Sequence, residues 1–130
     1  MRFLVLLSAT CVLAVGAALV AAAPQAQTDE TSRTDYQAFC SSCHGAAGRG
    51  DGTLAGSMRV KPADLTQVKA RNNGVFPKER MVKFVTNGHE SAGMPAWGDV
   101  FAKSQQSVGP DAARLRVEAL VQYLETLQAK

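Results

Sequence analysis

The segment Cys40-Ser41-Ser42-Cys43-His44 decides the fold of this chain. Cysteines three residues apart lie on one face of a helical turn, so their sulfurs can bond to two neighbouring positions of one planar group. The histidine directly after the second cysteine then lies beneath the centre of that group, where its ring can bind a metal. Cys-x-x-Cys alone also occurs in thiol redox proteins and zinc sites, whereas the added histidine completes the attachment sequence of a c-type haem. We therefore predict one covalently bound haem c, with Cys40 and Cys43 forming its thioethers and His44 binding its iron.

Residues 1–23 have the layout of a secretory signal peptide. Arg2 supplies an early positive charge, and an apolar run extends from Phe3 to Val20. Small and apolar residues then favour a cleavage site after Ala22. The apolar run is nearly long enough to span a bilayer, so an uncleaved membrane anchor is the alternative. We expect an exported, periplasmic protein that contacts the membrane only if this segment is retained.

The cysteine usage and the charge of the chain agree with this interpretation. Of three cysteines, Cys11 lies within the signal, which leaves Cys40 and Cys43 in the mature protein. In an oxidising compartment two neighbouring cysteines form a disulfide unless another bond consumes them, and haem attachment does so. With 14 Lys and Arg against 11 Asp and Glu, the charge is too balanced to predict nucleic-acid binding.

The chain between the signal and the haem motif has two expected parts. Residues 24–30 are polar and lack periodicity, which predicts a flexible linker. A helix is expected from Thr31, with Thr31 or Ser32 as its cap, and it closes with the haem motif at Gly45. The glycine-rich Gly48–Gly52 then predicts a loop.

The rest of the chain contributes further helices. One is expected from Pro77 to Thr86, with Asn87–Gly88 as its C-terminal stop. The glycines and prolines of His89–Gly98 argue against a regular element there. The last helix is expected to open at Pro110–Asp111, because apolar residues then follow at 3.6-residue spacing. No segment alternates like a strand, so residues 31–130 are predicted to form one all-α domain.

The residue opposite His44 on the iron decides the function, because a filled position leaves no site for a substrate. Four residues have suitable ligand chemistry: Met58, Met81, His89 and Met94. Met94 is favoured because Gly93 lets the backbone approach the porphyrin and Pro95 then stiffens it. It also lies far enough along the chain to reach the face opposite His44.

The other three candidates have more ordinary explanations. Met81 lies on the apolar face of a predicted helix, where methionine usually fills the core. Met58 follows the haem motif closely and is expected to pack or to be exposed. His89 is the serious competitor, since imidazole binds haem iron well, although its place after the helix stop also fits a solvent-facing residue.

Taken together, these segments resemble a class I c-type cytochrome of the small bacterial monohaem type, similar to cytochrome c6 and to the c-type domains of cbb3 oxidases. The matching segments are Tyr36–Gly45, Gly48–Gly52, Pro62–Thr66, Asn87–Gly88, Met94–Trp97 and Val121–Leu127. The resemblance implies an all-α cytochrome c fold in which about three to five helices wrap around one haem and the first and last helices cross. The chain departs from the family at Lys103–Pro110, which is longer and more polar than usual and predicts a lengthened surface loop.

The resemblance also implies roles for residues around the haem. Tyr36 and Tyr123 are expected to pair where the first and last helices cross. The carbonyl of Pro62 is expected to accept the ring N–H of His44 and so to fix its orientation. Trp97 is expected either to donate its indole N–H near a haem propionate or to be buried in the core.

The predicted function is single-electron transfer between redox partners by a monomeric carrier that is not itself an enzyme. With His44 and Met94 both bound, the iron has no vacant position, which leaves outer-sphere electron transfer as its chemistry. Three alternatives stay open. They are an electron-transfer subunit of a larger dehydrogenase or oxidase complex, an open-site haem enzyme or gas sensor, and a haem-free thiol–disulfide oxidoreductase that uses Cys40 and Cys43.

The charge pattern between Arg59 and Lys83 bears on the partner. Seven basic residues lie there against two acidic ones, Asp64 and Glu79. This excess predicts an acidic redox partner, with an ordinary solvated surface as the alternative. The basic residues are Arg59, Lys61, Lys69, Arg71, Lys78, Arg80 and Lys83.

Overall fold

The protein is described by a computed structural model that covers residues 23–104 and 110–129. The predicted signal peptide up to residue 22, and residues 105–109 of the predicted surface loop, lie outside the described residues. Within the two described ranges, no helix is both long enough and apolar enough to cross a bilayer.

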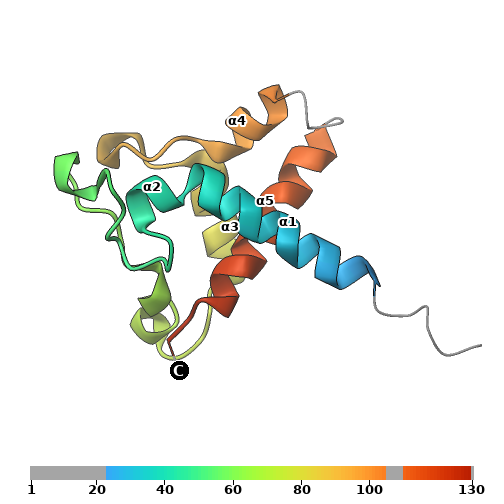
Figure 1. Cartoon of the computed structure of the whole chain (residues 1–130), viewed down its shortest axis with the longest axis horizontal. Helices are drawn as coiled ribbons and strands as arrows, with labels where there is room; N and C mark the ends of the chain where they lie inside the picture. Colours follow the sequence, from blue (N-terminus) through green and yellow to red (C-terminus); the bar gives the residue numbers. More distant parts are fainter. Residues whose placement is uncertain (1–22, 105–109, 130) are drawn as a thin grey trace, which may run out of the picture.

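The described chain is all-α, as predicted, and its helices are joined by loops with short 3-10 turns (Figure 1). The α-helices are α1 (Ala23–Phe39), α2 (Ser41–His44), α3 (Lys78–Asn87), α4 (Trp97–Lys103) and α5 (Pro110–Thr126). The 3-10 turns are η1 (Ala55–Ser57), η2 (Leu65–Gln67), η3 (Ala70–Asn72) and η4 (Glu90–Ala92). Within residues 23–104 and 110–129 no strand forms, and an isolated antiparallel bridge joins His89 to Met94.

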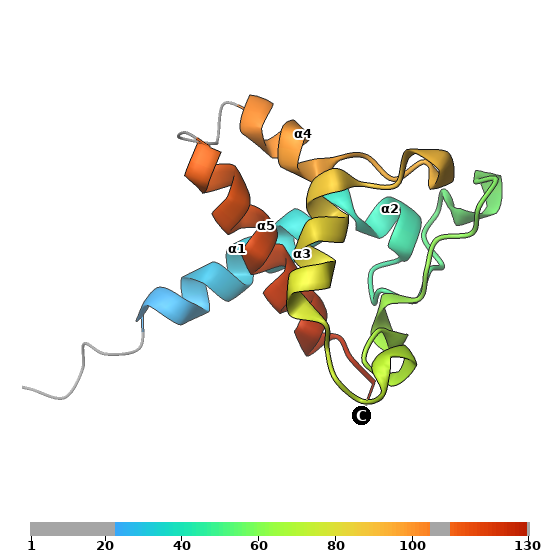
Figure 2. The ribbon, with the colours of Figure 1, turned by 180° about the vertical axis from the view of Figure 1, so that it is seen from behind.

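The flexible linker predicted at residues 24–30 is wrong, because this segment forms the first turns of α1. Proline is tolerated in the first turn of a helix, and alanine, glutamine and glutamate are good helix formers. Thr31 and Ser32 therefore lie inside the helix and do not cap it. Figures 1 and 2 show the first turns of α1 projecting beyond the other helices.

Helices α1 and α5 cross and pack against each other, as the resemblance implied (Figure 1). At the crossing, the ring centroids of Tyr36 and Tyr123 lie 5.4 Å apart with the rings tilted by 49°. The hydroxyl of the fully buried Tyr36 donates a hydrogen bond of 2.7 Å to the carbonyl of Gly45. Burial raises the pKa of Tyr36, so its hydroxyl stays protonated and able to donate. The predicted pair is confirmed, and Tyr36 also ties α1 to the end of α2.

The core lies along α5, which is packed between α1 on one side and α3 on the other (Figures 1 and 2). Its residues Val117, Val121 and Leu124 are buried at the predicted helical spacing. They form one apolar cluster with Val85 of α3 and Phe101 of α4. The predicted last helix is therefore confirmed in its start at Pro110 and in its buried face.

Helix α3 matches its prediction, whereas α4 was not expected. Gly88 ends α3 with a φ of 66°, and a Cβ there would lie 2.4 Å from the carbonyl carbon of Pro95. Only glycine fits this position, since it combines a left-handed φ with a close backbone approach. Helix α4 begins at Trp97 despite Gly98, because that glycine packs directly against Thr86 of α3. This tertiary contact outweighs the low helix propensity of glycine.

Candidate cofactor site

A cavity of about 370 Å³ lies between the helices and the long loops, and its walls are mainly apolar. Cys40, Cys43, His44 and Met94, the four predicted ligand residues, all line it. The structure thus brings two cysteines, an imidazole and a thioether to one apolar chamber. These are the donor groups of a c-type haem with two axial ligands, so the residues present fit this cofactor. Within the described residues, no cluster of three or more His, Cys, Asp or Glu side chains is arranged to hold a metal ion by itself.

The haem motif forms its own short helix, α2, which begins after Cys40 and ends at His44. The Nδ1 atom of His44 lies 2.9 Å from the carbonyl oxygen of Ala63. Because a carbonyl only accepts, this hydrogen bond requires a proton on Nδ1 and leaves the lone pair of Nε2 available for iron.

The predicted role of Pro62 is wrong by one residue, since the acceptor is the carbonyl of Ala63. The Pro62 carbonyl is turned toward Gly50 instead, and a Cβ at Gly50 would lie 2.5 Å from its oxygen. Pro62 still lines the cavity.

The glycine-rich loop Gly48–Gly52 is joined to α2 by backbone hydrogen bonds, a role that the sequence did not reveal. The amide of Gly50 donates to the carbonyl of His44 at 2.7 Å, and the amide of Gly52 donates to that of Cys43 at 3.2 Å. These bonds satisfy carbonyls that the end of a helix leaves free. A Cβ at Gly52 would lie 2.3 Å from the carbonyl oxygen of Ser42, so the loop needs glycine to come this close.

Cys40 and Cys43 are free thiols and are not joined by a disulfide. Burial, followed by the nearby Asp35 and Cys43, raises the pKa of the Cys40 thiol to about 12. Thiol–disulfide exchange needs a thiolate, and redox-active cysteines have lowered pKa values. The environment of Cys40 therefore argues against a thiol–disulfide oxidoreductase.

All four candidates for the second axial ligand line the cavity, including the three less favoured ones: Met58, Met81 and His89. His89 and Met94 face each other in the antiparallel bridge, with N···O distances of 2.9 and 3.1 Å in its two hydrogen bonds. Residues directly opposite in such a pair project their side chains to the same side. Met94 is half-buried, whereas the exposed His89 ring stacks on Phe84 at 5.7 Å between centroids.

Trp97 also lines the cavity and belongs to an aromatic group with Phe39 and Phe101. Its ring centroid lies 5.6 Å from each of these two phenylalanine rings. Trp97 therefore packs at the edge of the core, which is one of the two roles expected for it. A contact between its indole N–H and a haem propionate stays a prediction.

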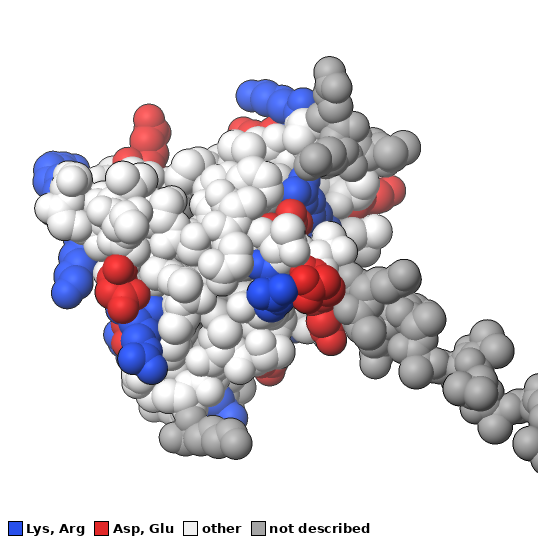
Figure 3. Space-filling model, viewed as in Figure 1, with Lys and Arg blue, Asp and Glu red and all other residues white. Residues whose placement is uncertain are grey.

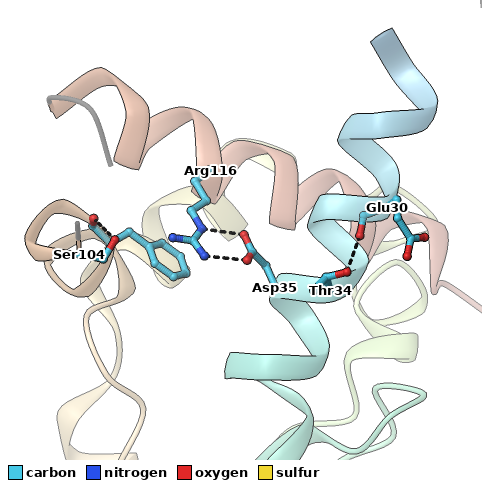
Figure 4. Close-up of polar contacts among 6 residues, drawn as sticks. Glu30, Thr34, Asp35, Ser104 and Arg116 are labelled. Atoms are coloured by element: carbon cyan, nitrogen blue, oxygen red, sulfur yellow. Dashed lines mark hydrogen bonds and ion pairs between the residues drawn. The ribbon is translucent and has the colours of Figure 1, made fainter. Parts of the chain in front are cut away.

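A partly buried ion pair beside this aromatic group was missed at the sequence level. Both Arg116–Asp35 hydrogen bonds are 2.6 Å long, from Nε to Oδ2 and from Nη2 to Oδ1 (Figure 4). Their side chains are only 17% and 10% exposed, and the bonds to Asp35 raise the pKa of Arg116. The Arg116 guanidinium also lies 4.3 Å from the ring centroid of Phe101. The sequence did contain a sign of this pair, because each helix has a charged residue at a position where its apolar face is expected. Asp35 lies four residues before Phe39, and Arg116 lies four residues before Leu120.

The family model described as cytochrome c oxidase, cbb3-type, subunit III matches residues 27–108. No curated protein and no solved structure shows a significant match to the chain. The matched range contains the C-x-x-C-H motif, the Ala63 carbonyl, the Met94 loop and α4.

Proposed function

Because the chain belongs to the family of cbb3-type cytochrome c oxidase subunit III, we propose that it carries single electrons between redox proteins through a haem c ligated by His44 and Met94. It is a class I c-type cytochrome with an all-α fold, and its cofactor is a covalently bound haem c. In this proposal Cys40 and Cys43 form the thioethers, and the protein acts in the periplasm as a monomer.

The observation that carries the proposal is that His44 and Met94, each held by a hydrogen bond or a backbone bridge, line the same apolar cavity. His44 is held by Ala63 with Nε2 free for iron, and Met94 is held by its bridge to His89. Haem iron supplies a one-electron redox couple, and thioether ligation raises its potential relative to two imidazoles. The chain's own part is to keep both ligands in place and to exclude water. Fixed ligands and an apolar wall limit rearrangement when the charge changes.

The Met94 loop is better organised as a ligand holder than the other candidate positions. Gly93 adopts a φ of 76°, and its amide donates to the carbonyl of Glu90 at 2.8 Å. The amide of Ala92 donates to the carbonyl of His89 at 3.0 Å, so the turn is closed by its own backbone. Met81, in contrast, lies within α3, and the ring of the exposed His89 stacks on Phe84.

The test of this proposal is the response of the reduced, haem-loaded protein to carbon monoxide. A six-coordinate iron has no vacancy, so the wild type should bind carbon monoxide slowly and incompletely. The Met94→Ala variant should bind it readily while keeping its covalent haem. Ready binding by the wild type would contradict Met94 ligation and would favour an open-site haem enzyme or gas sensor.

A second candidate function is an electron-transfer subunit of a larger oxidase, which the name of the matching family favours. The haem chemistry is the same in both cases, and the two differ only in whether the partner is permanent. Co-purification from the native membrane separates them. A stable complex with oxidase subunits would support the subunit, and isolation as a free monomer would support the carrier.

The basic residues between Arg59 and Lys83 support an acidic partner in either case. All seven are exposed. The ion pairs in the described part of the chain join other residues: Glu30–Arg33, Asp35–Arg116, Asp111–Arg114 and Arg114–Glu118. Figure 3 shows basic side chains along the left and lower left edge of one face, with acidic side chains among them. Such a surface can steer an acidic protein during encounter.

A further inference from the structure

Two residues that follow η1, Met58 and Arg59, contact the loop that carries Met94. The Nη2 atom of Arg59 donates a 2.9 Å hydrogen bond to the carbonyl of Ser91, across 32 residues of sequence. The terminal methyl of Met58 lies 3.1 Å from the position that a Cβ on Gly93 would take. Figures 1 and 2 both show the segment after η1 beside the loop between α3 and α4.

We propose that Met58 and Arg59 form a latch that holds the Met94 loop closed over the iron and so sets how easily Met94 is displaced. The inference rests on the proposed function, since it takes Met94 as the axial ligand. Arg59 and Met58 are positioning residues in this account, because they act on the iron only through Met94.

The position of the latch supports this role. Ser91 and Gly93 lie between His89 and Met94, on the turn that the antiparallel bridge closes. The bridge keeps the shape of the turn, but both of its partners belong to the turn itself. Arg59 and Met58 instead belong to the half of the chain that carries the haem motif. They therefore tie the ligand loop to the segment that follows the haem motif.

The chemistry of the two contacts also suits a latch. A guanidinium that donates to a carbonyl forms a charge-assisted hydrogen bond, which is stronger than a neutral one. The methyl of Met58 fills the space beside Gly93, which has no side chain of its own, and Met58 lines the cavity. Methionine adapts well to such irregular gaps.

The latch has a measurable consequence because an external ligand binds this iron only when Met94 has left. The apparent affinity for an external ligand is then scaled by the fraction of molecules with an open loop. Loss of one net hydrogen bond raises that fraction by about three- to tenfold. The free energy of unfolding should fall by a similar amount, because the unfolded chain also lacks this hydrogen bond.

The experiment is an imidazole titration of the oxidised, haem-loaded protein, followed by loss of the absorption band that reports the bond between methionine and iron. The pH is kept above the pKa of imidazole, so that the ligand is neutral and the charge of the protein does not bias its binding. The matched control is Arg80→Ala, which removes an exposed arginine bonded to Asn72, away from the loop. Urea unfolding of each variant is measured alongside.

The Arg59→Ala variant should bind imidazole about three- to tenfold more tightly than the wild type, because it lacks one hydrogen bond. The Met58→Ala variant should also bind imidazole more tightly, because it lacks the packing contact beside Gly93. The Arg59→Lys variant should recover most of the wild-type value, and Arg80→Ala should equal the wild type. Equal affinities for Arg59→Ala and Arg80→Ala would overturn the latch and leave Met94 ligation intact. Loss of the methionine–iron band in Met58→Leu would instead show that Met58 is the ligand, which would overturn the proposed ligation and the latch with it.

Discussion

His44 can bind iron in only one way, because the carbonyl of Ala63 accepts a hydrogen bond from its Nδ1. This carbonyl fixes the tautomer and the orientation of the ring. Gly50 in turn allows the chain at Pro62 and Ala63 to approach, since no side chain intervenes. The orientation of His44 therefore depends on its hydrogen bond to Ala63 and on the lack of a side chain at Gly50.

Replacing Met94 tests its predicted role as the second ligand of the iron. The Met94→Ala variant should keep its covalent haem, and its reduction potential should fall by on the order of 0.1 V, because the thioether no longer favours the reduced iron. Redox titration measures the change. Met81→Leu is the matched control, since Met81 also lines the cavity and leucine preserves its volume. Similar potentials for Met94→Ala and the wild type would exclude Met94 as a ligand.

Replacing Gly50 tests the support of His44. At Gly50, φ is 75° and a Cβ would lie 2.5 Å from the Pro62 carbonyl oxygen, so Gly50→Ala should lower the free energy of unfolding by about 1–3 kcal/mol. Urea unfolding of the haem-loaded protein gives this value. Gly56→Ala is the control, because a Cβ there meets no atom within 4 Å. Equal losses in both variants would show that the approach of Pro62 to the loop is unimportant.

At the scale of secondary-structure elements, the crossing of α1 and α5 holds the cofactor site together. The rings of Tyr36 and Tyr123 pack against each other where the helices cross, and the Asp35–Arg116 ion pair joins the same two helices nearby. The guanidinium of Arg116 also lies over the ring of Phe101, so α4 is attached to the same point. Side chains of α1 and α4 thus both contact the guanidinium of Arg116 on α5.

Breaking this ion pair should destabilise the fold strongly. Asp35→Ala leaves the partly buried Arg116 charge without its partner and should cost about 1–3 kcal/mol in the free energy of unfolding. Chemical denaturation of the haem-loaded protein measures the loss. The double variant Asp35→Leu/Arg116→Met should recover most of it, since an apolar pair of similar volume removes both charges. Glu30→Ala, which removes an exposed pair on α1, is the control and should leave the midpoint nearly unchanged. Equal midpoints for Asp35→Ala and Glu30→Ala would contradict the role of the buried pair.

Elements whose signals are local were predictable from the sequence. The C-x-x-C-H turn, α3 with its Gly88 stop, and the buried face of α5 all depend on neighbouring residues, and all three are confirmed. The start of α1 and the presence of α4 were not predicted. The start of α1 has no apolar periodicity in the sequence, and α4 depends on the contact of Gly98 with Thr86.

In the candidate site, too, the residues set by local spacing were predictable, and those set by distant contacts were not. The positions of Cys40, Cys43 and His44 follow from spacing along one turn, and the structure places all three on one cavity. The Ala63 carbonyl was missed by one position, because spacing identifies the segment but not the direction of each carbonyl. The Asp35–Arg116 pair joins residues 81 positions apart, and no pattern within a single sequence specifies such a partner.

At the scale of the whole molecule, the cofactor replaces a central part of the core. The cavity of about 370 Å³ is lined by apolar residues from α1, α3 and α5 as well as from the loops. A small domain rarely supplies enough buried surface by itself, and a covalently attached porphyrin provides the missing apolar contacts. Fold and function therefore depend on the same group.

Removing the attachment points should accordingly prevent folding. The variant Cys40→Ala/Cys43→Ala, expressed with a working haem-ligation system, should lack covalent haem and show little cooperative thermal unfolding. Circular dichroism detects the loss of helical structure. A haem-free variant with a normal, cooperative unfolding transition would show that the helices pack without the cofactor.

The excess of basic side chains predicts how the molecule meets its partner. Electron exchange with an acidic redox protein should slow as ionic strength rises from about 0.01 M to 0.15 M, because the Debye length shortens from about 30 Å to 8 Å. Stopped-flow mixing measures the rate. The double variant Lys61→Gln/Lys78→Gln should weaken the dependence on salt. A rate that is independent of ionic strength would remove electrostatic steering from the account.

The central claim is that one haem c is held between the imidazole of His44 and the thioether of Met94. Absorption spectra of the oxidised and reduced protein, taken after expression with a haem-ligation system, test it most directly. The account predicts the sharp bands of a low-spin c-type haem on reduction and the weak methionine–iron band on oxidation. It also predicts that this weak band is absent from Met94→Ala. A colourless polypeptide, or a coloured one whose methionine–iron band survives in Met94→Ala, would contradict the claim.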